Sequence, residues 1–172
     1  MSELIQALSR VDIQERVRFL GRSISKDYSG KNPVVIGVLK GAFIFLADLV
    51  RDISIPVRID FIRLASYGEG TESSGTVEIT KDIELKIDGQ HVLIVEDIVD
   101  SGRTLAFLVR YLKGFNPLSV RICTLINKTE RRDRAVVVDY EGFNVESGFL
   151  VGYGLDFNED YRTLPDINIL KP

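Results

Sequence analysis

Three acidic residues and a loop of small residues lie next to one another near the middle of the chain. Glu96 and Asp97 are adjacent, Asp100 follows three residues later, and residues 101–104 are Ser, Gly, Arg and Thr. At the start of a helix, such a loop offers backbone N–H groups, hydroxyls and the positive end of the helix dipole, which together bind a phosphate. Carboxylates beside it would repel a bare phosphate, so they indicate a ligand that also carries hydroxyls, a metal ion or a developing positive charge. A ribose 5-phosphate meets these requirements, with its phosphate on the loop and its 2- and 3-hydroxyls on the acids.

The residues on either side predict the elements that position this group. Residues 92–95 are all apolar, which is typical of a strand buried on both faces. After the loop, apolar residues recur at the spacing of one helix face, at Leu105, Leu108, Val109 and Leu112. The segment therefore predicts a strand, an acidic turn, a phosphate-binding loop and a helix, in that order. Open parallel sheets bind their ligands at the carboxyl ends of such strands.

Other interpretations of this segment are weaker. A Walker A loop would place Asp97 at its first glycine and Arg103 at its lysine, and no dinucleotide-binding Gly-x-Gly-x-x-Gly pattern follows the strand. Asp100 and Ser101 could instead cap the helix, with Glu96 and Asp97 as solvated loop acids, because caps are common. Three acids together with a phosphate-type loop at a strand end favour a binding site over a cap.

The segment Val-Leu-Ile-Val-Glu-Asp-Ile-Val-Asp-Ser-Gly-Arg-Thr at residues 92–104 resembles the phosphoribosyl-pyrophosphate signature of the type I phosphoribosyltransferases. Leu-Lys-Gly at residues 39–41, Ser-Tyr-Gly at 66–68 and Val-Gly-Tyr-Gly-Leu-Asp at 151–156 resemble motifs of the hypoxanthine-guanine branch of that family. The resemblance covers nearly the whole chain.

The resemblance implies both a fold and a reaction. The fold would be α/β, a mostly parallel twisted sheet flanked by helices, with a small hood formed by the N- and C-terminal segments, in one domain over residues 1–172. The reaction would transfer 5-phosphoribosyl from phosphoribosyl pyrophosphate to N9 of hypoxanthine or guanine, giving IMP or GMP and pyrophosphate. Mg²⁺ would be the cofactor, and members of the family commonly form homodimers or homotetramers.

The resemblance also implies a role for each residue of the central motif. Asp100 would be the catalytic residue, exchanging a proton with N7 of the purine as N9 attacks. Glu96 and Asp97 would bind the ribose hydroxyls, directly or through the metal ion, and Asp156 would be a further metal ligand. The 5-phosphate would be bound by Asp100, Ser101, Gly102, Arg103 and Thr104.

Residues outside the central motif complete the implied site. By the resemblance, the pyrophosphate would be bound by Leu39, Lys40 and Gly41, where the family has an unusual peptide geometry, and by Arg162. The purine would be bound by Lys128, Phe149, Leu150 and Asp156. Because an ammonium group only donates hydrogen bonds, Lys128 would accept a 6-oxo group and reject adenine, whose 6-amino group is also a donor. On spacing alone, Lys128 would be a solvated lysine and Phe149 a core residue.

A polar segment follows a predicted strand at residues 57–63. Residues 66–76 are rich in Gly, Ser and charged residues, so they cannot bury themselves and predict a mobile loop. This loop is either an ordinary hairpin connection or a lid that excludes water from the reaction. The resemblance favours the lid, with Ser66 and Tyr67 as lid residues. In the preceding strand, the alternation predicts a drier face and a wetter one, formed by Val57, Ile59 and Phe61 and by Arg58, Asp60 and Arg63.

Periodicity predicts the remaining elements. Helices are expected over residues 11–28 and 42–51, and buried strands over 34–39, 120–126 and 136–138. Further expectations are a solvated basic cluster of Arg131, Arg132 and Arg134, a buried Cys123 that acts as a small hydrophobe, and a structural His91.

Composition narrows the class of protein. The 172 residues are 45% apolar and 27% charged, which are ordinary values for a globular chain. With 22 basic and 25 acidic residues, the net charge of −3 argues against a nucleic-acid-binding surface. The longest apolar run, residues 42–47, is far too short to span a membrane, and the chain does not open with a signal-peptide pattern. We therefore expect a cytoplasmic protein with small-molecule ligands.

Two functions of other classes stay open at this point. A phosphoribosyltransferase-like regulatory module would bind a nucleotide without turnover. A phosphoacceptor receiver domain would also place acids around Mg²⁺ at a strand end, with Asp60 as the phosphorylated residue and Lys128 as the later lysine. The receiver interpretation leaves residues 101–104 and Phe149 without a purpose.

Overall fold

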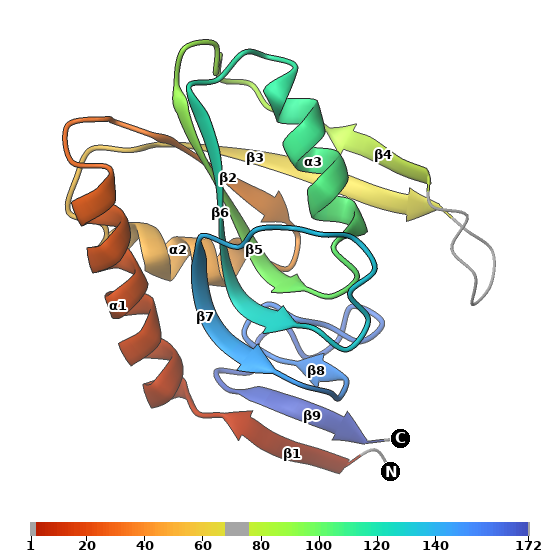
Figure 1. Cartoon of the computed structure of the whole chain (residues 1–172). Helices are drawn as coiled ribbons and strands as arrows, with labels where there is room; N and C mark the ends of the chain where they lie inside the picture. Colours follow the sequence, from red (N-terminus) through yellow and green to blue (C-terminus); the bar gives the residue numbers. More distant parts are fainter. Residues whose placement is uncertain (1–2, 68–75, 172) are drawn as a thin grey trace.

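Two β-sheets of different size form the framework of the protein (Figure 1). The computed structural model describes residues 3–67 and 76–171. The larger sheet has the strand order β4-β3-β2-β5-β6-β7, with bounds β2 Val34–Leu39, β3 Arg58–Tyr67, β4 Thr76–Lys81, β5 His91–Val99, β6 Ser119–Lys128 and β7 Tyr140–Val145. The smaller sheet has the order β1-β9-β8, with bounds β1 Glu3–Leu8, β8 Leu150–Val151 and β9 Ile167–Lys171.

The larger sheet is mostly parallel, which confirms the predicted α/β class. Its strands β2, β3, β5, β6 and β7 run in the same direction, and β4 pairs antiparallel with β3 at the edge. The apolar residues 92–95 lie in β5, an interior strand between β2 and β6, and all of them are fully buried. The prediction of a strand buried on both faces was therefore correct.

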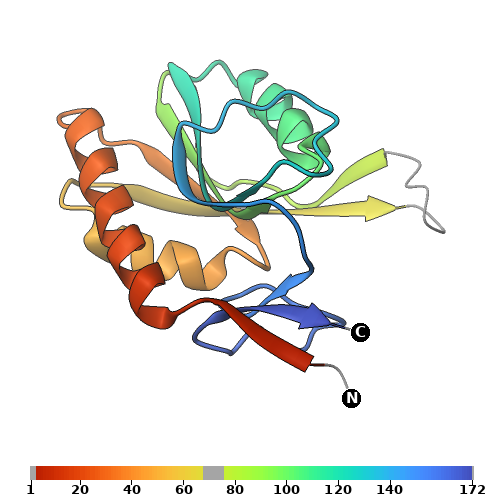
Figure 2. The ribbon, with the colours of Figure 1, turned by 60° about the horizontal axis from the view of Figure 1, so that its bottom comes forward.

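Helices cover both faces of this sheet (Figure 2). The helices α1 (Arg10–Asp27) and α2 (Phe43–Asp52) lie on one face and α3 (Arg103–Lys113) on the other. Successive side chains of β5 point to opposite faces. Leu93 and Val95 thus pack in the core with α1 and α2, and Val92 and Ile94 pack in the core with α3. Cys123 is buried in the first of these cores, as predicted.

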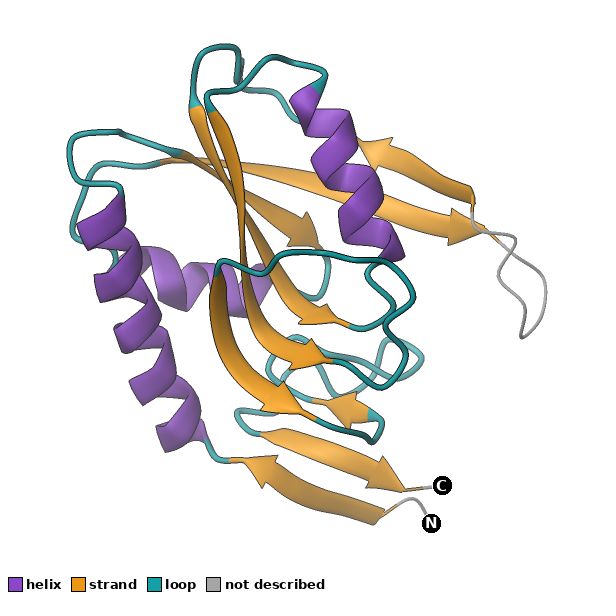
Figure 3. Ribbon diagram, viewed as in Figure 1, coloured by secondary structure: helices purple, strands orange, loops and turns teal. Residues whose placement is uncertain are grey.

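The smaller sheet is the hood predicted from the two ends of the chain. β1 pairs antiparallel with β9, from Glu3 opposite Lys171 to Leu8 opposite Ile167. β8 pairs with the other edge of β9. In Figure 1 the arrowheads of β5, β6 and β7 point toward this sheet, and Figure 3 shows loops gathered between them. The hood therefore stands beside the carboxyl ends of the parallel strands.

The predicted strand at residues 136–138 is wrong. These residues belong to an irregular connection between β6 and β7, and Val137 is 80% exposed. Since β7 runs parallel to β6, the chain must return along the sheet before β7 can begin at Tyr140. Val136 and Val138 pack against the α3 core during this return, so the valines cover a sheet face without joining the sheet.

The predicted wetter face of β3 is wrong at one of its three residues. Arg58 and Arg63 are exposed, as predicted, but Asp60 is only 5% exposed, and Ile59, expected on the drier face, is half-exposed. The Asp60 carboxylate accepts hydrogen bonds from the backbone N–H groups of Phe61, Glu84 and Leu85. Burial opposes its ionisation, but these hydrogen bonds prevail and lower the pKa of Asp60. An acid held this way near the start of β3 is a structural group, which removes the basis for the receiver interpretation.

Two smaller expectations can also be compared with the structure. His91 opens β5, and its Nδ1 lies 2.8 Å from Ser119 Oγ on the neighbouring strand β6, so it links two strands as a structural residue. Within residues 3–67 and 76–171, no helix is both long and apolar enough to cross a membrane.

Candidate active site

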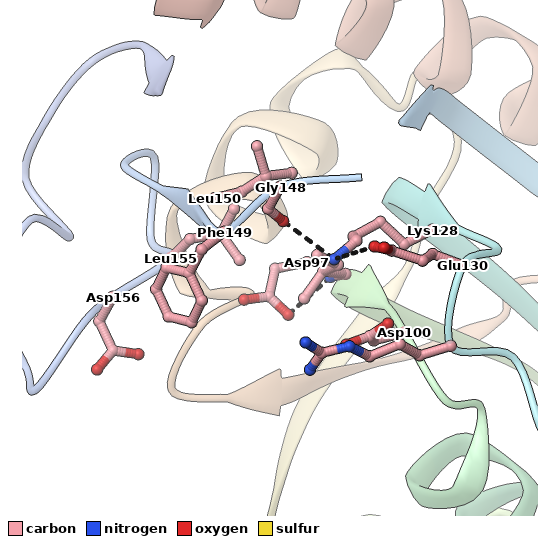
Figure 4. A pocket seen from close by; sticks show the side chains of 11 residues that line it. Asp97, Asp100, Lys128, Glu130, Gly148, Phe149, Leu150, Leu155 and Asp156 are labelled. Carbon is pink, nitrogen blue, oxygen red and sulfur yellow. Dashed lines mark hydrogen bonds and ion pairs between the residues drawn. The ribbon is translucent and has the colours of Figure 1, made fainter. Parts of the chain in front are cut away.

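A cavity of about 430 Å³ opens between the carboxyl ends of the central strands and the hood (Figure 4). Its walls come from three parts of the chain, namely the end of β5, the end of β6 and the segment from Gly148 to Asp156. A smaller hollow of about 210 Å³ shares Asp97, Ile98 and Asp100 with this cavity and is also lined by Ser101, Gly102, Thr104 and Leu105. Most residues predicted for the ribose, the phosphate and the purine therefore line two adjoining spaces.

Strand register brings Asp100 and Lys128 close together. Val99 in β5 pairs with Asn127 in β6, so the next residue of each strand enters the same cavity. The Oδ1 atom of Asp100 is buried and has no hydrogen-bond partner within the described residues. It therefore keeps a lone pair available for a proton or a hydrogen bond from a ligand.

The phosphate-type loop leads into α3 as predicted. Gly102 is the N-cap residue, has a left-handed backbone with φ of 82°, and provides no side-chain cap for the helix. A Cβ atom at this position would lie 2.7 Å from the carbonyl oxygen of Arg134, so no larger residue fits without a shift of the backbone. Ser101 Oγ accepts from the N–H of Arg103 over 3.3 Å. Ser101, Gly102, Thr104 and Leu105 line the smaller hollow, so the start of α3 borders a space suited to an anion.

Glu96 and Asp97 form a buried acid pair. Their exposed fractions are 8% and 9%, and the N–H of Asp97 donates to Glu96 Oε1 over 3.2 Å. Burial raises the pKa of Glu96 well above its usual range, and the neighbouring charge of Asp97 raises it further. Burial also raises the pKa of Asp97. The pair therefore resists carrying two negative charges until a cation or hydrogen-bond donors approach it.

The turn after β2 packs against Asp97 of this acid pair through Gly41. A Cβ atom on Gly41 would overlap with Asp97 Oδ2, and one on Gly154 would overlap with the carbonyl oxygen of Gly41. Glycine is therefore required at both positions for the three segments to meet. The peptide bond between Leu39 and Lys40 in this turn is cis, the unusual geometry that the family resemblance implied.

Two cations predicted for pyrophosphate come together on a shared acid. Lys40 Nζ lies 2.9 Å from Glu159 Oε2, and Arg162 Nη2 lies 3.3 Å from the same oxygen. Arg162 also forms an ion pair of 3.0 Å with Asp156 and donates to the carbonyl oxygen of Gly154. The hydrogen bond from Lys40 lowers the pKa of Glu159. Glu159 thus occupies the position where a phosphate oxygen of a ligand would meet both cations.

The residues predicted to bind the purine face one another across the larger cavity (Figure 4). Lys128 is 6% exposed, and its Nζ donates to the carbonyl oxygen of Gly148 over 3.0 Å. Phe149 is 51% exposed, and its ring meets the ring of Phe157 edge-on, with centroids 5.5 Å apart. Phe149 is therefore no core residue. Its carbonyl accepts from Leu170 in β9, so the hood holds the start of β8, where Leu150 lies.

Comparison with known proteins identifies the family to which the chain belongs. The profile of the family described as phosphoribosyl transferase domain matches residues 9–158. The hypoxanthine-guanine phosphoribosyltransferase of Bacillus subtilis is 44% identical over 165 residues, which are 96% of this chain and 92% of that protein. The chain belongs to the hypoxanthine-guanine branch of the phosphoribosyltransferase family.

Further relatives extend the comparison. The bifunctional protein TilS/HprT of Listeria innocua is 49% identical over 165 residues, which are 96% of this chain but 26% of that protein. The chain thus spans about a quarter of the length of such bifunctional relatives. A hypoxanthine-guanine phosphoribosyltransferase structure from Bacillus anthracis has a TM-score of 0.93 at 45% identity and covers 97% of this chain and 99% of its own. A hypoxanthine phosphoribosyltransferase structure from Staphylococcus aureus has a TM-score of 0.94 at 42% identity, with 97% and 91% covered.

The remaining predicted site residues are those of the lid and Arg103, and Arg103 lines neither of the two cavities. The lid prediction falls largely on residues 68–75, which lie outside the described residues. Ser66 and Tyr67 end β3, where their backbones pair with Val77 and Thr76 of β4. Arg103 begins α3 and forms an ion pair with Asp133.

The sequence analysis missed three residues of the site in this member of the family. Glu130 and Arg131 line the larger cavity, and Glu159 bridges Lys40 and Arg162. Their charges alone resemble those of any solvated turn. Only their position after a strand end, close to Lys128 or Asp156 in the chain, could have marked them.

The prediction of Arg132 as a solvated residue is wrong. Its guanidinium is partly buried and donates to oxygens on two strand ends, those of β5 and β6. Arg134 is exposed, in agreement with the prediction for that residue.

Proposed function

We propose that this chain transfers the 5-phosphoribosyl group of phosphoribosyl pyrophosphate to N9 of hypoxanthine or guanine, releasing pyrophosphate and IMP or GMP. The observation that carries the proposal is the meeting of the N-terminus of α3, a buried acid pair and Lys128 opposite an exposed Phe149 around two adjoining cavities. Family membership and relatives named for this activity support it.

The substrate would lie across both cavities. The 5-phosphate would bind the N-terminus of α3 through residues 101–104, and the ribose hydroxyls would bind Glu96 and Asp97. The pyrophosphate would meet Lys40 and Arg162 by displacing Glu159, which now satisfies both cations. The backbone at Leu39 and Gly41 would contact the same group.

Mg²⁺ fits the donors that this site offers. Glu96, Asp97 and Asp156 supply carboxylate oxygens, which Mg²⁺ prefers, and the ion is usually held by one or two carboxylates together with substrate phosphates and water. Within the described residues, no three His, Cys, Asp or Glu side chains are grouped closely enough to hold a metal ion. Substrate phosphates and water would therefore have to supply the other ligands. When bound, Mg²⁺ would neutralise charge on the departing pyrophosphate.

The purine would bind between Phe149 and Lys128. Its ring would stack on the exposed face of Phe149, and its 6-oxo group would accept from Lys128 in place of the Gly148 carbonyl that now does so. Adenine would be rejected because its 6-amino group presents a donor to the Lys128 ammonium. The backbone carbonyl of Leu150 and the region of Asp156 would meet the 2-position of the base.

The chemical step would exchange one bond at C1 of the ribose for another. As the bond from C1 to the pyrophosphate oxygen breaks, the ring gains positive charge, which the acid pair favours. N9 of the purine then bonds to C1, and the proton on N7 passes to Asp100. The unpartnered Oδ1 of Asp100 is suited to receive it.

Other features of the chain belong to the same proposal. Residues 66–76, with Ser66 and Tyr67 at their start, would close over the reaction and exclude water that competes for the activated ribose. Residues 1–172 would form one domain that acts in the cytoplasm, assembled as a homodimer or homotetramer, without nucleic-acid or membrane partners.

A spectrophotometric screen tests the proposal directly. The protein is mixed with phosphoribosyl pyrophosphate, Mg²⁺ and one of hypoxanthine, guanine, xanthine or adenine, and nucleotide and pyrophosphate are both measured. We expect equimolar product with hypoxanthine or guanine and none with adenine. Nucleotide binding without pyrophosphate release would overturn the proposal in favour of a regulatory module.

A further inference from the structure

Arg132 joins two strand ends, the end of β5 that leads into Asp100 and the end of β6 at Lys128. Its Nε donates to the carbonyl oxygen of Asp100 over 3.0 Å, and its Nη2 donates to the carbonyl oxygen of Lys128 over 2.8 Å. Nη2 also contacts the carbonyl oxygen of Val99 and the side-chain oxygen of Asn127. These four oxygens belong to the last paired residues of β5 and β6 and to the residues that directly follow them in the site.

Arg132 lies where the hydrogen-bonded pairing between β5 and β6 ends. The pairing of β5 with β6 ends at Val99 and Asn127. Beyond that pair, the guanidinium takes over as the donor and connects the two backbones through one planar group. Arginine suits this task because its donors lie in a rigid fork, whereas the donors of lysine radiate from a single point.

The residues after Arg132 act on the phosphate loop in the same way. The N–H groups of Asp133 and Arg134 both donate to the carbonyl oxygen of Ser101, over 3.1 and 3.2 Å. In a planar trans peptide, a carbonyl and the following N–H point in opposite directions. With the carbonyls of Asp100 and Ser101 turned toward this segment, the N–H groups of Ser101 and Gly102 point the other way. The loop therefore offers donors, and not carbonyl oxygens, to an anion.

We propose that Arg132 is a positioning residue for phosphoribosyl transfer, which fixes the spacing between Asp100 and Lys128. The two purine atoms that these residues would meet, N7 and the 6-oxo oxygen, lie side by side on one edge of the base. One side chain that binds the backbone of both residues sets the spacing which that edge requires. The inference rests on the proposed function, since that function gives Asp100 and Lys128 their partners.

The first test replaces Arg132 by methionine and by lysine. A misplacement of about 1 Å at a reacting group can cost about 10²-fold in rate. We expect Arg132→Met to lower kcat with hypoxanthine by about that factor, and Arg132→Lys to recover part of the loss. The control is Arg110→Met, which removes the same charge from an exposed side chain on α3 that lines neither cavity. It should retain normal turnover.

A double-mutant cycle separates positioning from general stabilisation. If Arg132 acts through Asp100, then Arg132→Lys costs turnover in the wild-type background and much less in the Asp100→Ala background. Equal fold losses in both backgrounds would overturn the inference. So would an Arg132→Met protein that melts at a lower temperature yet keeps wild-type kcat when assayed while folded. The lysine variant keeps the test usable where the methionine variant does not fold.

These outcomes differ from failure of the proposed function. A wild-type protein that releases no pyrophosphate with any 6-oxopurine removes the function itself. An active wild type with no coupling between positions 132 and 100 removes only the role of Arg132.

Discussion

Helices α1 and α3 begin in opposite ways, although both start next to acidic residues. At α1, Ser9 accepts from the N–H of Asp12, and the Asp12 carboxylate accepts from the N–H of Ser9, which is a complete capping box. At α3, the cap position is Gly102, which has no side chain to cap the helix, and Ser101 Oγ accepts from the N–H of Arg103 over 3.3 Å. The first helix thus closes its terminus with a reciprocal pair of hydrogen bonds, whereas at the third a single side-chain contact meets the first N–H group. A helix start without a capping box, at the carboxyl edge of the sheet, is therefore a sign of function in this fold.

The acids beside the two helices differ in the same way. Asp12 is exposed and stabilises the helix that it caps. Glu96 and Asp97 are buried, and burial opposes their charge. If the comparison is right, changes near α3 act on the reaction and changes near α1 act on stability. The following predictions test that division, from the largest expected effect to the smallest.

Removing the carboxylate of Asp100 should have the largest effect. We expect Asp100→Ala to lower kcat by roughly 10²- to 10⁴-fold, because the buried, unpartnered Oδ1 of Asp100 would receive the proton from N7. Binding of IMP, measured by calorimetry, should survive. Asp100→Asn, which keeps the shape but not the base, should lose nearly as much. Near-normal turnover in either variant would remove Asp100 from the chemistry.

The start of α3 itself can be damaged at Gly102. Alanine there would have to adopt a φ of 82° and approach the carbonyl oxygen of Arg134, which costs about 1–3 kcal/mol of strain. We expect Gly102→Ala to raise KM for phosphoribosyl pyrophosphate by about 10- to 100-fold in steady-state kinetics. Gly114→Ala, at the other end of the same helix where φ is −62°, is the control and should bind normally.

The acid pair should reveal itself in the pH dependence of stability. Since the folded-state pKa of Glu96 is raised, the folded protein keeps a proton that the unfolded chain releases above a pH of about 4. The free energy of unfolding should therefore fall as pH rises from about 4 toward the folded-state pKa. Glu96→Gln cannot titrate, so urea unfolding at several pH values should show a smaller fall for this variant. Glu15→Gln, an exposed change on α1, should leave the pH dependence of the free energy of unfolding as in the wild type. If Glu96→Gln and the wild type showed the same pH dependence, Glu96 would not keep its proton in the folded protein.

The smallest effect is expected at α1. Ser9→Ala removes one half of the capping box and should lower the free energy of unfolding by about 1 kcal/mol. Since α1 lies away from both cavities, kcat and KM should not change. Chemical unfolding and steady-state kinetics on the same sample check both statements. A kinetic defect at normal stability would break the comparison between the two helices.

Local pattern was sufficient for the central segment and for the order of the elements. Four buried apolar residues, the acids, the small-residue loop and the helical spacing from Leu105 predicted β5, the turn and α3, because each signal lies within about a dozen neighbouring residues. The same reasoning failed where a residue's surroundings come from elsewhere in the chain. Three consecutive valines at 136–138 look like a strand, yet they lie in a crossover, and Asp60 looks solvated, yet Glu84 and Leu85 cover it.

By itself, the sequence determined which groups could bind a sugar phosphate and in what order they occur, because helix starts, buried strands and acid clusters are local properties. Only the tertiary structure decided which distant residues meet these groups. Glu159 reaches Lys40 across more than half of the chain, and Arg132 reaches the backbone of Asp100 from the neighbouring strand end. Such contacts depend on how parallel strands are registered and where a crossover returns, which the spacing of residues along the chain does not specify.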